Sequence, residues 1–522
     1  MKKKYIFLPI IAAMISLPSC VNDEGNDTMA PINEIEISGI EEEYNVVTQQ
    51  ETLVITPEIK GSLSKADESD LSYEWYLCNN DITEHAHTVI STERNLSYPV
   101  IAPPSNYSLY FSVKDNATGL KWEYECALNI ISPFVRGFYL FGDKADETVG
   151  LDFISMIDGR ENTIIPNILN NDLGLKGAED AIFTGYYSFY PDFNNLWIIT
   201  KSGSYQVENS ASQTSFNLMK EASNAENFIF PTIPVTRPMK VINVWPHSIG
   251  KTNTNLARTG RVICTENEYF NGSFYGAAEA YGNPINRYSA STSELFKPSK
   301  YVFYPGNSTY VSGLCFYNET DNCFVRLNSS FALAKNSVKL NNNGTPFYFD
   351  QKQYASERSL IYGENGYGNA GRSYALMRDT EGNYFIYLFR VASYASVTAQ
   401  AERTIDLSIA PEFASADHYA FYSMQQIILY SVGSKLYAYD YGRHENKLIR
   451  DFGAEVTYIG MDYNSNNNPN HLLVATYGNG KGMVYGYNMT DNQNLIEVTP
   501  VEGEEWQTEL KVVKIEYRNA AN

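Results

Sequence analysis

The fold is decided by a stretch in the last third of the chain, Ile428-Leu429-Tyr430-Ser431-Val432-Gly433-Ser434-Lys435-Leu436-Tyr437-Ala438-Tyr439-Asp440-Tyr441. Two runs of apolar and aromatic residues flank the pair Gly433-Ser434. This pattern is typical of two antiparallel strands joined by a tight turn. The stretch therefore predicts a β-hairpin.

Similar strand pairs recur from about Gly137 to Arg518, at spacings of roughly 40–60 residues and without a long amphipathic helix between them. This recurrence predicts a β-propeller of about seven blades. Blade numbers from about six to eight agree with the same spacing. The run Lys511–Arg518 is expected to pair with the strand near Phe138 and close the ring, which would remove exposed sheet edges. Two stacked sandwich domains are the alternative architecture.

A smaller β domain is predicted before the propeller, over residues 33–132. The stretch Leu71–Leu77 alternates strictly, which places Tyr73 and Trp75 on one face of a half-buried strand. The other predicted strands of this region are separated by turns rich in Ser, Asp, Asn and Gly, as in an immunoglobulin-like β-sandwich. The chain is thus expected to be all-β, with an immunoglobulin-like sandwich followed by a propeller-like domain over residues 133–522.

The first residues have the layout of a secretory signal peptide, with Lys2, Lys3 and Lys4 before a short apolar run. The run is too short to span a bilayer as a helix. It ends in Leu17-Pro18-Ser19-Cys20, which resembles the lipobox of bacterial lipoproteins. This resemblance implies that residues 1–19 are removed and that Cys20 carries the lipid anchor, palmitate included.

The acidic stretch after Cys20 is interpreted as a tether over residues 20–32. Asp23, Glu24 and Asp27 resemble the export signal that sends Bacteroidota lipoproteins to the outer face of the outer membrane. A plain solvated tether without a sorting role is the alternative. The resemblance predicts an extracellular, lipid-anchored protein.

The amino-acid composition of the chain limits the classes of molecule that it is expected to bind. The chain has a formal net charge of −21, with 19% charged residues, 14% aromatic residues and 41 Tyr. Long-range repulsion would oppose binding to nucleic acid or to anionic polysaccharide, so neither is an expected partner. Abundant Tyr suits extracellular surfaces that bind by stacking and hydrogen bonding.

The six cysteines agree with export. With Cys20 lipidated, a disulfide is predicted between Cys315 and Cys323, which flank a turn, and another between Cys78 and Cys126, which would join the two sheets of the sandwich. Cys264 would remain free. Neither a CxxC motif nor a Cys/His cluster is present, so no metal is expected.

Part of the chain resembles a known family. Tyr73-Glu74-Trp75 together with Tyr110–Gly119 is similar to the signature of the PKD-like domain of Bacteroidota lipoproteins, over roughly residues 31–132. Arg136–Asp143 resembles the opening of the second domain of these lipoproteins. The family implies display on the outer membrane, often beside SusC/SusD-like nutrient importers, and it supplies no catalytic residue.

Several motifs for catalysis are absent: the sequence lacks HExxH, GxSxG, the P-loop and an EF-hand loop. No catalytic residue and no cofactor are therefore assigned. A pair of carboxylates for glycoside cleavage could still converge from distant blades, because such a pair is defined in space. His85-Ala86-His87 is interpreted as a solvated loop, since a third ligand is not nearby.

Two aromatic segments are the candidate ligand-binding surfaces. They alternate aromatic rings with Asn, Gly and Glu, and they contain Tyr269, Phe270, Phe274, Tyr275, Tyr281 and Tyr288 in the first and Tyr362 and Tyr367 in the second. Such loops offer flat faces and amides to sugar rings or peptide side chains. The alternative is that these rings pack between blades.

The expected function is non-catalytic capture of oligopeptides or oligosaccharides as an accessory to a SusC/SusD-like importer. The alternatives are a surface glycan hydrolase with a carboxylate pair in the propeller cavity and a structural subunit of the importer complex. A buried cluster of two or three Asp or Glu residues with raised pKa values at the central channel would favour the hydrolase. An aromatic platform without such carboxylates would favour binding.

Overall fold

The computed structural model describes residues 32–62, 70–82, 87–184, 195–208, 216–245, 247, 261–272, 280–305, 313–331, 333–463 and 468–518. Its regular elements are strands, apart from α2 (Gly368–Gly371) and the 3-10 helices η3 (Ala225–Asn227), η5 (Gln351–Gln353) and η6 (Pro411–Ser415). The protein is all-β, as predicted.

The chain forms two compact units. The first comprises the described part of Met1–Tyr44, with Thr52–Tyr98 and Tyr107–Leu128. The second comprises Asn45–Glu51, Pro99–Asn106 and the described residues from Asn129 onward.

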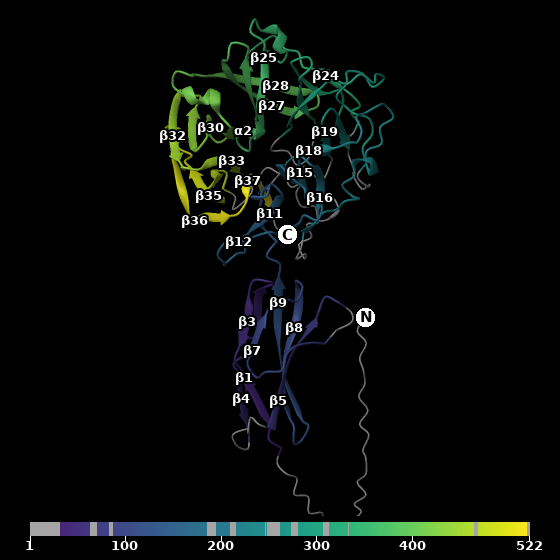
Figure 1. Cartoon of the computed structure of the whole chain (residues 1–522), viewed down its shortest axis with the longest axis vertical. Helices are drawn as coiled ribbons and strands as arrows, with labels where there is room; N and C mark the ends of the chain where they lie inside the picture. Colours follow the sequence, from purple (N-terminus) through teal and green to yellow (C-terminus); the bar gives the residue numbers. More distant parts are fainter. Residues whose placement is uncertain are drawn as a thin grey trace, which may run out of the picture. The chain divides into compact units, whose positions relative to one another are not determined.

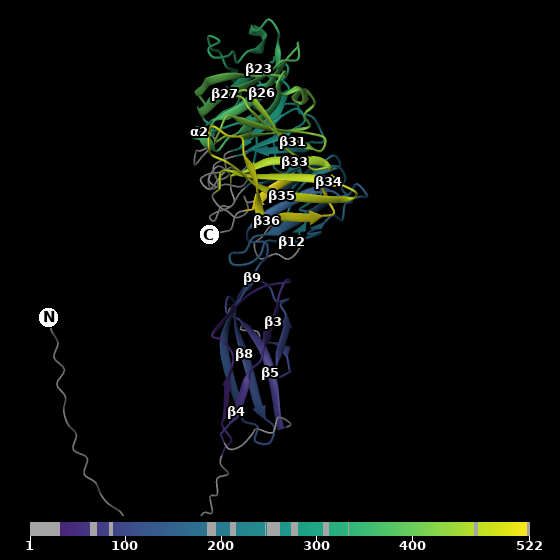
Figure 2. The same cartoon turned by 90° about the vertical axis from the view of Figure 1, so that its left-hand side faces the viewer.

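The N-terminal sheets form a β-sandwich (Figure 2). One sheet has five strands in the order β2-β9-β8-β5-β6, with bounds Glu43–Val47, Lys121–Ile131, Ser105–Asp115, Leu71–Asn79 and Thr88–Ser91. Two strand pairs complete it: β1-β4 (Ile35–Ser38, Glu58–Gly61) and β3-β7 (Thr52–Ile55, Leu96–Pro99).

The sandwich core is built around Trp75. This side chain is fully buried, and its ring stacks on Phe111 at a centroid distance of 4.3 Å. Its indole Nε1 donates to the carbonyl oxygen of Glu93 at 3.1 Å, so the one polar atom of the ring is satisfied. Trp75 and Leu77 are buried as predicted, but Tyr76 between them is buried too, because its ring stacks on Tyr110 at 4.8 Å, so burial along this strand does not alternate strictly.

The predicted Cys78–Cys126 disulfide is wrong: both thiols are free. Cys78 lies on β5 and Cys126 on β9, and these strands are separated by β8 within one sheet. Neighbouring strands are about 4.8 Å apart, so the two Cα atoms are roughly 10 Å apart, beyond the reach of a disulfide. The prediction failed because it placed the two strands in different sheets.

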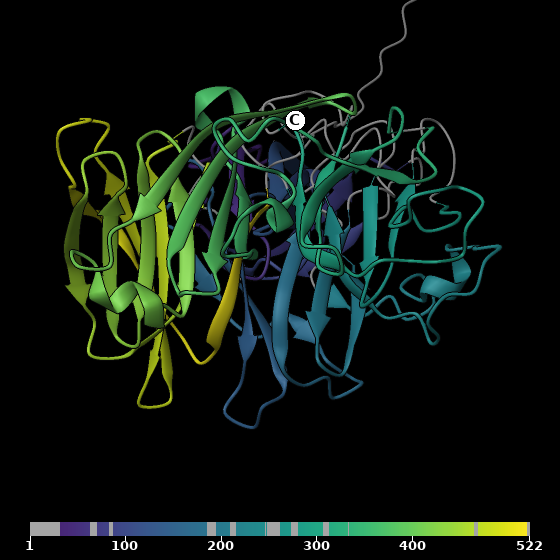
Figure 3. The same cartoon turned by 90° about the horizontal axis from the view of Figure 1, so that it is seen from above.

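Seven sheets of three or four strands follow in the described residues after Asn129, and they succeed one another around a ring (Figures 1 and 3). The first contains β10 (Gly137–Asp143), β11 (Val149–Ser155) and β12 (Thr163–Ile165) together with β37 (Lys511–Arg518). The second and third are β14-β15-β16 (Ala178–Phe183, Leu196–Thr200, Gly203–Val207) and β18-β19-β20 (Val241–Trp245, Arg261–Thr265, Tyr269–Gly272).

Four four-stranded antiparallel sheets continue the ring. They are β21–β24 (Pro298–Phe303, Cys315–Asn318, Cys323–Leu327, Ser337–Lys339) and β25–β28 (Arg358–Asn365, Ser373–Asp379, Tyr384–Ser393, Ser396–Ile405). They continue with β29–β32 (His418–Tyr422, Ile427–Val432, Lys435–Asp440, Glu445–Asp451) and β33–β36 (Glu455–Asp462, His471–Gly478, Lys481–Met489, Val498–Thr508). The short strands β13 (Leu169–Asn170) and β17 (Phe216–Asn217) pair in parallel. The blade number of the complete ring stays a prediction.

The hairpin predicted for Ile428–Tyr441 is present as β30 and β31. Ile427 pairs with Asp440 and Val432 with Lys435, so the turn falls at Gly433-Ser434, as predicted. Gly433 has a φ of 56°, a left-handed conformation that glycine adopts without steric cost.

Each sheet packs against the next one around the ring. One core cluster joins the sheets of β10 and β14 through residues such as Phe153 and Ile198, and another joins those of β29 and β33 through residues such as Leu429 and Val474. Because both faces of a sheet are covered, the central strands are apolar on both sides.

The ring is closed by β37. This strand pairs antiparallel with β10, with Gly137 opposite Arg518 and Asp143 opposite Lys511. The predicted closure near Phe138 is confirmed. A core cluster that includes Leu140, Val484 and Val512 joins this sheet to the sheet of β33, which excludes the alternative of two stacked sandwiches.

The predicted Cys315–Cys323 disulfide is also wrong, since both thiols are free. The two residues lie on paired strands, but Cys315 is opposite Arg326 and Cys323 is opposite Asn318. Cys315 faces the sheet of β25, whereas Cys323 faces the sheet of β18. Opposite faces of one hairpin cannot be bridged. Cys264 is free and buried.

Candidate functional site

A cavity of about 330 Å³ lies where the inner strands of the ring meet. Its lining comes mainly from β14, β18, β21, β25, β33 and β37, several of which are labelled near the middle of the ring in Figure 1. At its edge lie Glu179 and Lys300, whose side chains are exposed, so the cavity reaches the surface there. The ring therefore encloses a site whose size is at the lower end of the range of ligand pockets.

Among the lining residues, three carboxyl groups and one amino group come together from three strands: Asp180 from β14, Glu364 from β25, and Lys514 and Glu516 from β37. The amino group of Lys514 lies 3.3 Å from Oδ1 of Asp180 and 3.8 Å from Oε2 of Glu516. Burial alone would lower the pKa of Lys514, but the two carboxylates raise it above its ordinary value. Lys514 is therefore a permanent ammonium group held between Asp180 and Glu516.

Glu364 is the third carboxyl group. Its Oε2 accepts hydrogen bonds from the backbone N–H of Phe421 at 2.8 Å and from the hydroxyl of Tyr362 at 2.9 Å. Burial raises the pKa of Glu364 to about 7, although these two hydrogen bonds and the charge of Lys514 act in the opposite direction. Glu364 thus titrates near neutral pH.

Glu516 has a comparable environment. Burial raises its pKa to about 7 against the opposing charge of Lys514, and its Oε1 accepts from the backbone N–H of Phe183 at 3.1 Å. Phe183 ends β14, and Phe421 lies on β29. Each glutamate therefore binds the inner strand of a neighbouring sheet as well as facing the cavity.

Aromatic rings form much of the remaining wall. Tyr301 and Tyr362 meet edge to face at a centroid distance of 5.5 Å, and the imidazole of His247 stacks on Trp245 at 3.9 Å. Burial lowers the pKa of His247 to about 3, so this imidazole is neutral. The other lining aromatics are Phe138, Tyr304, Tyr458, Tyr463 and Tyr517.

A buried histidine stands behind one wall of the cavity. The imidazole of His471 lies 2.9 Å from Oδ2 of Asp462, which lines the cavity, and 2.6 Å from Oε2 of Glu504. Burial would lower the pKa of His471, but the two carboxylates raise it to about 9. His471 is therefore an imidazolium at neutral pH and neutralises part of this wall.

The predicted aromatic residues have different positions. Tyr269, Phe270 and Tyr281 are buried in the clusters between sheets, where their rings offer no face to a ligand. Their assignment as ligand-binding residues is wrong, because Tyr269 and Phe270 lie on β20 and Tyr281 forms a bridge with Ile229 instead of lying in an exposed loop. Phe274 and Tyr275 lie outside the described residues, as do Cys20, Asp23, Glu24 and Asp27.

Tyr362 lines the central cavity. Tyr367 is partly exposed and stacks on Tyr463, another lining residue, at 5.6 Å. These two positions agree with a role beside a ligand, although the binding itself stays a prediction.

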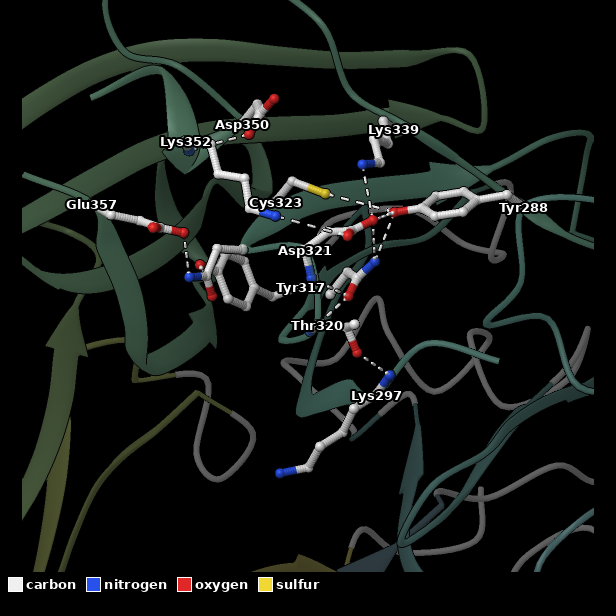
Figure 4. A network of polar contacts seen from close by, with 12 residues as sticks. Tyr288, Lys297, Tyr317, Thr320, Asp321, Cys323, Lys339, Asp350, Lys352 and Glu357 are labelled. Atoms are coloured by element: carbon white, nitrogen blue, oxygen red, sulfur yellow. Dashed lines mark hydrogen bonds and ion pairs between the residues drawn. The ribbon is translucent and has the colours of Figure 1, made fainter. Parts of the chain in front are cut away.

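Tyr288 belongs to a separate polar network around Asp321 (Figure 4). Its hydroxyl donates to Oδ2 of Asp321 at 2.6 Å, and the amino group of Lys339 lies 2.8 Å from the same oxygen. Lys352 approaches Oδ1 at 3.9 Å. These partners lower the pKa of Asp321, Lys339 first. The network fixes the turn between β22 and β23 and occupies the hydroxyl of Tyr288.

Sequence reasoning missed Asp180, Glu364, Lys514 and Glu516 as a group. One signal was present: Lys514-Ile515-Glu516 places two charged residues on one face of a strand that otherwise reads as apolar. Glu364 lay inside an aromatic stretch that was singled out for its rings. In the part of the chain that the structure describes, no three His, Cys, Asp or Glu side chains gather in a way that would hold a metal ion.

Comparison with known proteins finds one family model that matches the N-terminal part of this all-β chain. Residues 20–177 match the model of the PKD-like family. The match begins at Cys20 and continues past residue 132 through β10, β11 and β12, so it covers more than the region predicted from the signature. No curated protein is similar enough to the chain to count as a relative.

Several solved structures are similar at low identity. A quinonprotein alcohol dehydrogenase-like protein from Bacteroides thetaiotaomicron is 12% identical over 93% of this chain and 99% of that chain, with a TM-score of 0.38. The extracellular domain of a putative one component system from the same organism is 10% identical over 88% of this chain and 54% of that chain, with a TM-score of 0.36. The WD40 domain of SCAP from fission yeast is 10% identical over 65% and 72% of the two chains, with a TM-score of 0.32.

Within the described ranges, no helix is long and apolar enough to cross a bilayer.

Proposed function

We propose that this chain is a surface lipoprotein, anchored to the outer membrane through Cys20, that captures nutrient oligomers without catalysis as an accessory to a SusC/SusD-like importer. The central cavity is the proposed seat of the ligand. The resemblance of the N-terminal residues to lipoprotein signals and the PKD-like match over residues 20–177 support the location.

One observation carries the proposal: the ring encloses a cavity of about 330 Å³ whose wall combines aromatic rings with hydrogen-bonding groups. Ligand sites in proteins have this combination. Glu364 and Glu516 each bind a backbone N–H of a neighbouring sheet. These hydrogen bonds hold the two carboxyl groups in place as part of the cavity wall.

A specific observation favours a second candidate, a surface hydrolase. Burial raises the pKa of Glu364 and of Glu516 to about 7, and both groups face one cavity. A carboxyl group that stays protonated near neutral pH can act as a general acid, and a second carboxylate can act as base or nucleophile. Two glutamates with raised pKa values meet the criterion set out for the hydrolase.

Two measurements on membranes from the native host test the first proposal. The protein with Cys20 intact should co-purify with importer subunits and be cut by protease added to whole cells, whereas Cys20→Ala should lose the membrane fraction. The triple variant Asp23→Asn, Glu24→Gln, Asp27→Asn should keep the anchor but become protected from external protease. Protection of the unchanged protein in intact cells would contradict the surface location.

An assay for hydrolysis distinguishes the proposed binding protein from the proposed hydrolase. Purified protein is incubated with oligosaccharide and oligopeptide mixtures, and the products are followed by mass spectrometry. The binding proposal expects intact ligands. Cleavage that disappears in both Glu364→Gln and Glu516→Gln, and persists in the exposed-site control Glu381→Gln, would establish the hydrolase instead.

A further inference from the structure

The central cavity has an excess of negative charge. Its lining contains five carboxyl groups, those of Glu179, Asp180, Glu364, Asp462 and Glu516, and two amino groups, those of Lys300 and Lys514. Lys514 is paired with Asp180 and Glu516, and Asp462 is paired with His471. Of the two carboxyl groups outside these pairs, that of Glu179 is exposed at the cavity edge, which leaves one carboxyl group inside the cavity to explain.

That group is Glu364. No Lys, Arg or His among the described residues forms an ion pair with it, although its side chain lies in the cavity wall. Its Oε2 is held by Phe421 and Tyr362. Burying a carboxylate without a counter-charge is costly, and here burial raises the pKa of Glu364 to about 7. A cation that entered the cavity would supply the missing counter-charge.

The rings around Glu364 suit the same kind of ligand. Tyr362 donates to the carboxyl group, and Tyr301 meets Tyr362 edge to face at 5.5 Å. Tyr458 lines the wall beside them. Aromatic faces attract organic cations that lie within about 6 Å of the ring centre, and the attraction grows where water is excluded. Lys514 opposes such a ligand only weakly, because its own charge is already paired with two carboxylates. The amino group of Lys300 lies 5.3 Å from the centre of the Tyr301 ring, so a ligand cation would share this ring with it.

We propose that the central cavity binds an organic ammonium group, as presented by the lysine side chain of a peptide, with Glu364 as its counter-charge and the rings of Tyr301 and Tyr362 as its walls. This inference rests on the proposed function and narrows its ligand class from peptide or glycan to basic peptide. A neutral sugar would remove water from Glu364 without supplying the missing charge, so it is the less suitable occupant.

The test is calorimetric titration of the purified full chain with two blocked tripeptides, N-acetyl-Ala-Lys-Ala-amide and the same peptide with an acetylated lysine side chain. The lysine peptide should bind saturably, and acetylation should weaken binding by at least about tenfold, because it removes the charge and keeps the shape. Lactose serves as the neutral saccharide probe and should not bind.

The variants locate the site. Glu364→Gln keeps an acceptor for Phe421 but removes the charge, and it should weaken the lysine peptide by at least about tenfold. Tyr301→Leu should weaken it by about three- to tenfold without changing any charge. Glu381→Gln, an exposed glutamate in a turn away from the cavity, should bind like the unchanged protein. Equal thermal unfolding midpoints show that each variant is folded.

The outcomes are distinguishable. Binding of lactose without binding of the lysine peptide would overturn the ligand class and leave ligand capture standing. Equal binding of the two tripeptides, or unchanged binding by Glu364→Gln, would overturn the role of Glu364. Absence of binding by all three probes would overturn this inference, while co-purification with importer subunits tests the accessory role independently.

Discussion

The positive charge of a single buried residue, His471, contributes to the stability of the folded protein. Its imidazolium lies between Asp462 and Glu504, and its side chain is only 4% exposed. A buried cation between two carboxylates stabilises the fold as long as it stays protonated. Removing it leaves two carboxylates in a buried place without their counter-charge.

The first prediction follows from the pKa of His471, which is raised to about 9 in the folded protein from an ordinary value of 6.5. The stabilisation is complete below about pH 6.5 and is lost as the pH rises through about 9. The free energy of unfolding should therefore fall across this interval, by on the order of 3 kcal/mol. Urea unfolding at pH 6, 7.5 and 9 measures it.

His471→Asn should cost about 3–5 kcal/mol at pH 6 and flatten this pH dependence. His444→Asn replaces an exposed histidine, so it should leave the slope unchanged. An unchanged slope in His471→Asn would show that other groups cause the pH dependence.

The cysteines give a second prediction at this scale. All five described cysteines are free, and four of them, Cys126, Cys264, Cys315 and Cys323, are buried. Unreduced protein unfolded in guanidinium should therefore react with five equivalents of maleimide apart from Cys20. In the native state only Cys78 should react, and slowly, because burial raises the pKa of its thiol. Mass spectrometry counts the labels, and a mass lower by two or four labels would reveal disulfides.

The residue-level errors have one physical origin. Tyr269, Phe270 and Tyr281 carry the same mixture of aromatic and polar neighbours that an exposed loop would have. In a ring of sheets both faces of each strand are covered, so an aromatic-rich stretch is no evidence of exposure. Glu364 and Glu516 could not be paired from the sequence, because they are brought to one cavity only when distant strands close the ring.

Among the elements, β10 and β37 set the tightest steric limits. The pairing of these strands shifts register between Phe141 and Gly142. A Cβ atom at Gly142 would lie 2.2 Å from the carbonyl oxygen of Lys511 and 2.8 Å from Cα of Val512. The closure of the ring therefore requires a residue without a side chain at this position.

The third prediction is that Gly142→Ala destabilises the protein by about 1–3 kcal/mol, since backbone atoms of β37 must move aside. Gly282→Ala is the matched control: no heavy atom lies within 4 Å of its added Cβ, and its φ is not in the left-handed region. Thermal unfolding of the two variants makes the comparison. Equal midpoints would mean that the contact between β10 and β37 relaxes freely.

Elements with a local signal were predictable. The hairpin of β30 and β31 was read from Gly433-Ser434, and the closing strand from the apolar run that contains Val512 and Ile515. The order of strands within the sandwich was not predictable, because the sequence does not state which strands are neighbours. That is why Cys78 and Cys126 were assigned to different sheets, whereas β8 separates them within one sheet.

In the whole molecule, the ring is held closed by the pairing of β10 with β37, its first and last described strands. Deleting residues 511–518 would remove β37, expose β10 and remove Lys514 and Glu516 from the cavity. The fourth prediction is that this deletion replaces a cooperative unfolding transition with a broad one and increases binding of a hydrophobic dye.

Deletion of residues 519–522 alone is the control and should leave both measurements unchanged. A cooperative transition in the longer deletion would show that the remaining sheets hold the ring together without β37.

Ring closure between Gly137 and Arg518 also sets the order of events during biosynthesis. Nearly four hundred residues must leave the ribosome before β10 meets its partner, so every earlier intermediate carries an open sheet edge. A chain cut short by a nonsense mutation or by proteolysis would lack its closing strand and stay a substrate for degradation. Completion of the ring is thus coupled to synthesis of the last strand: only a chain that extends through Arg518 can form the whole pairing with β10.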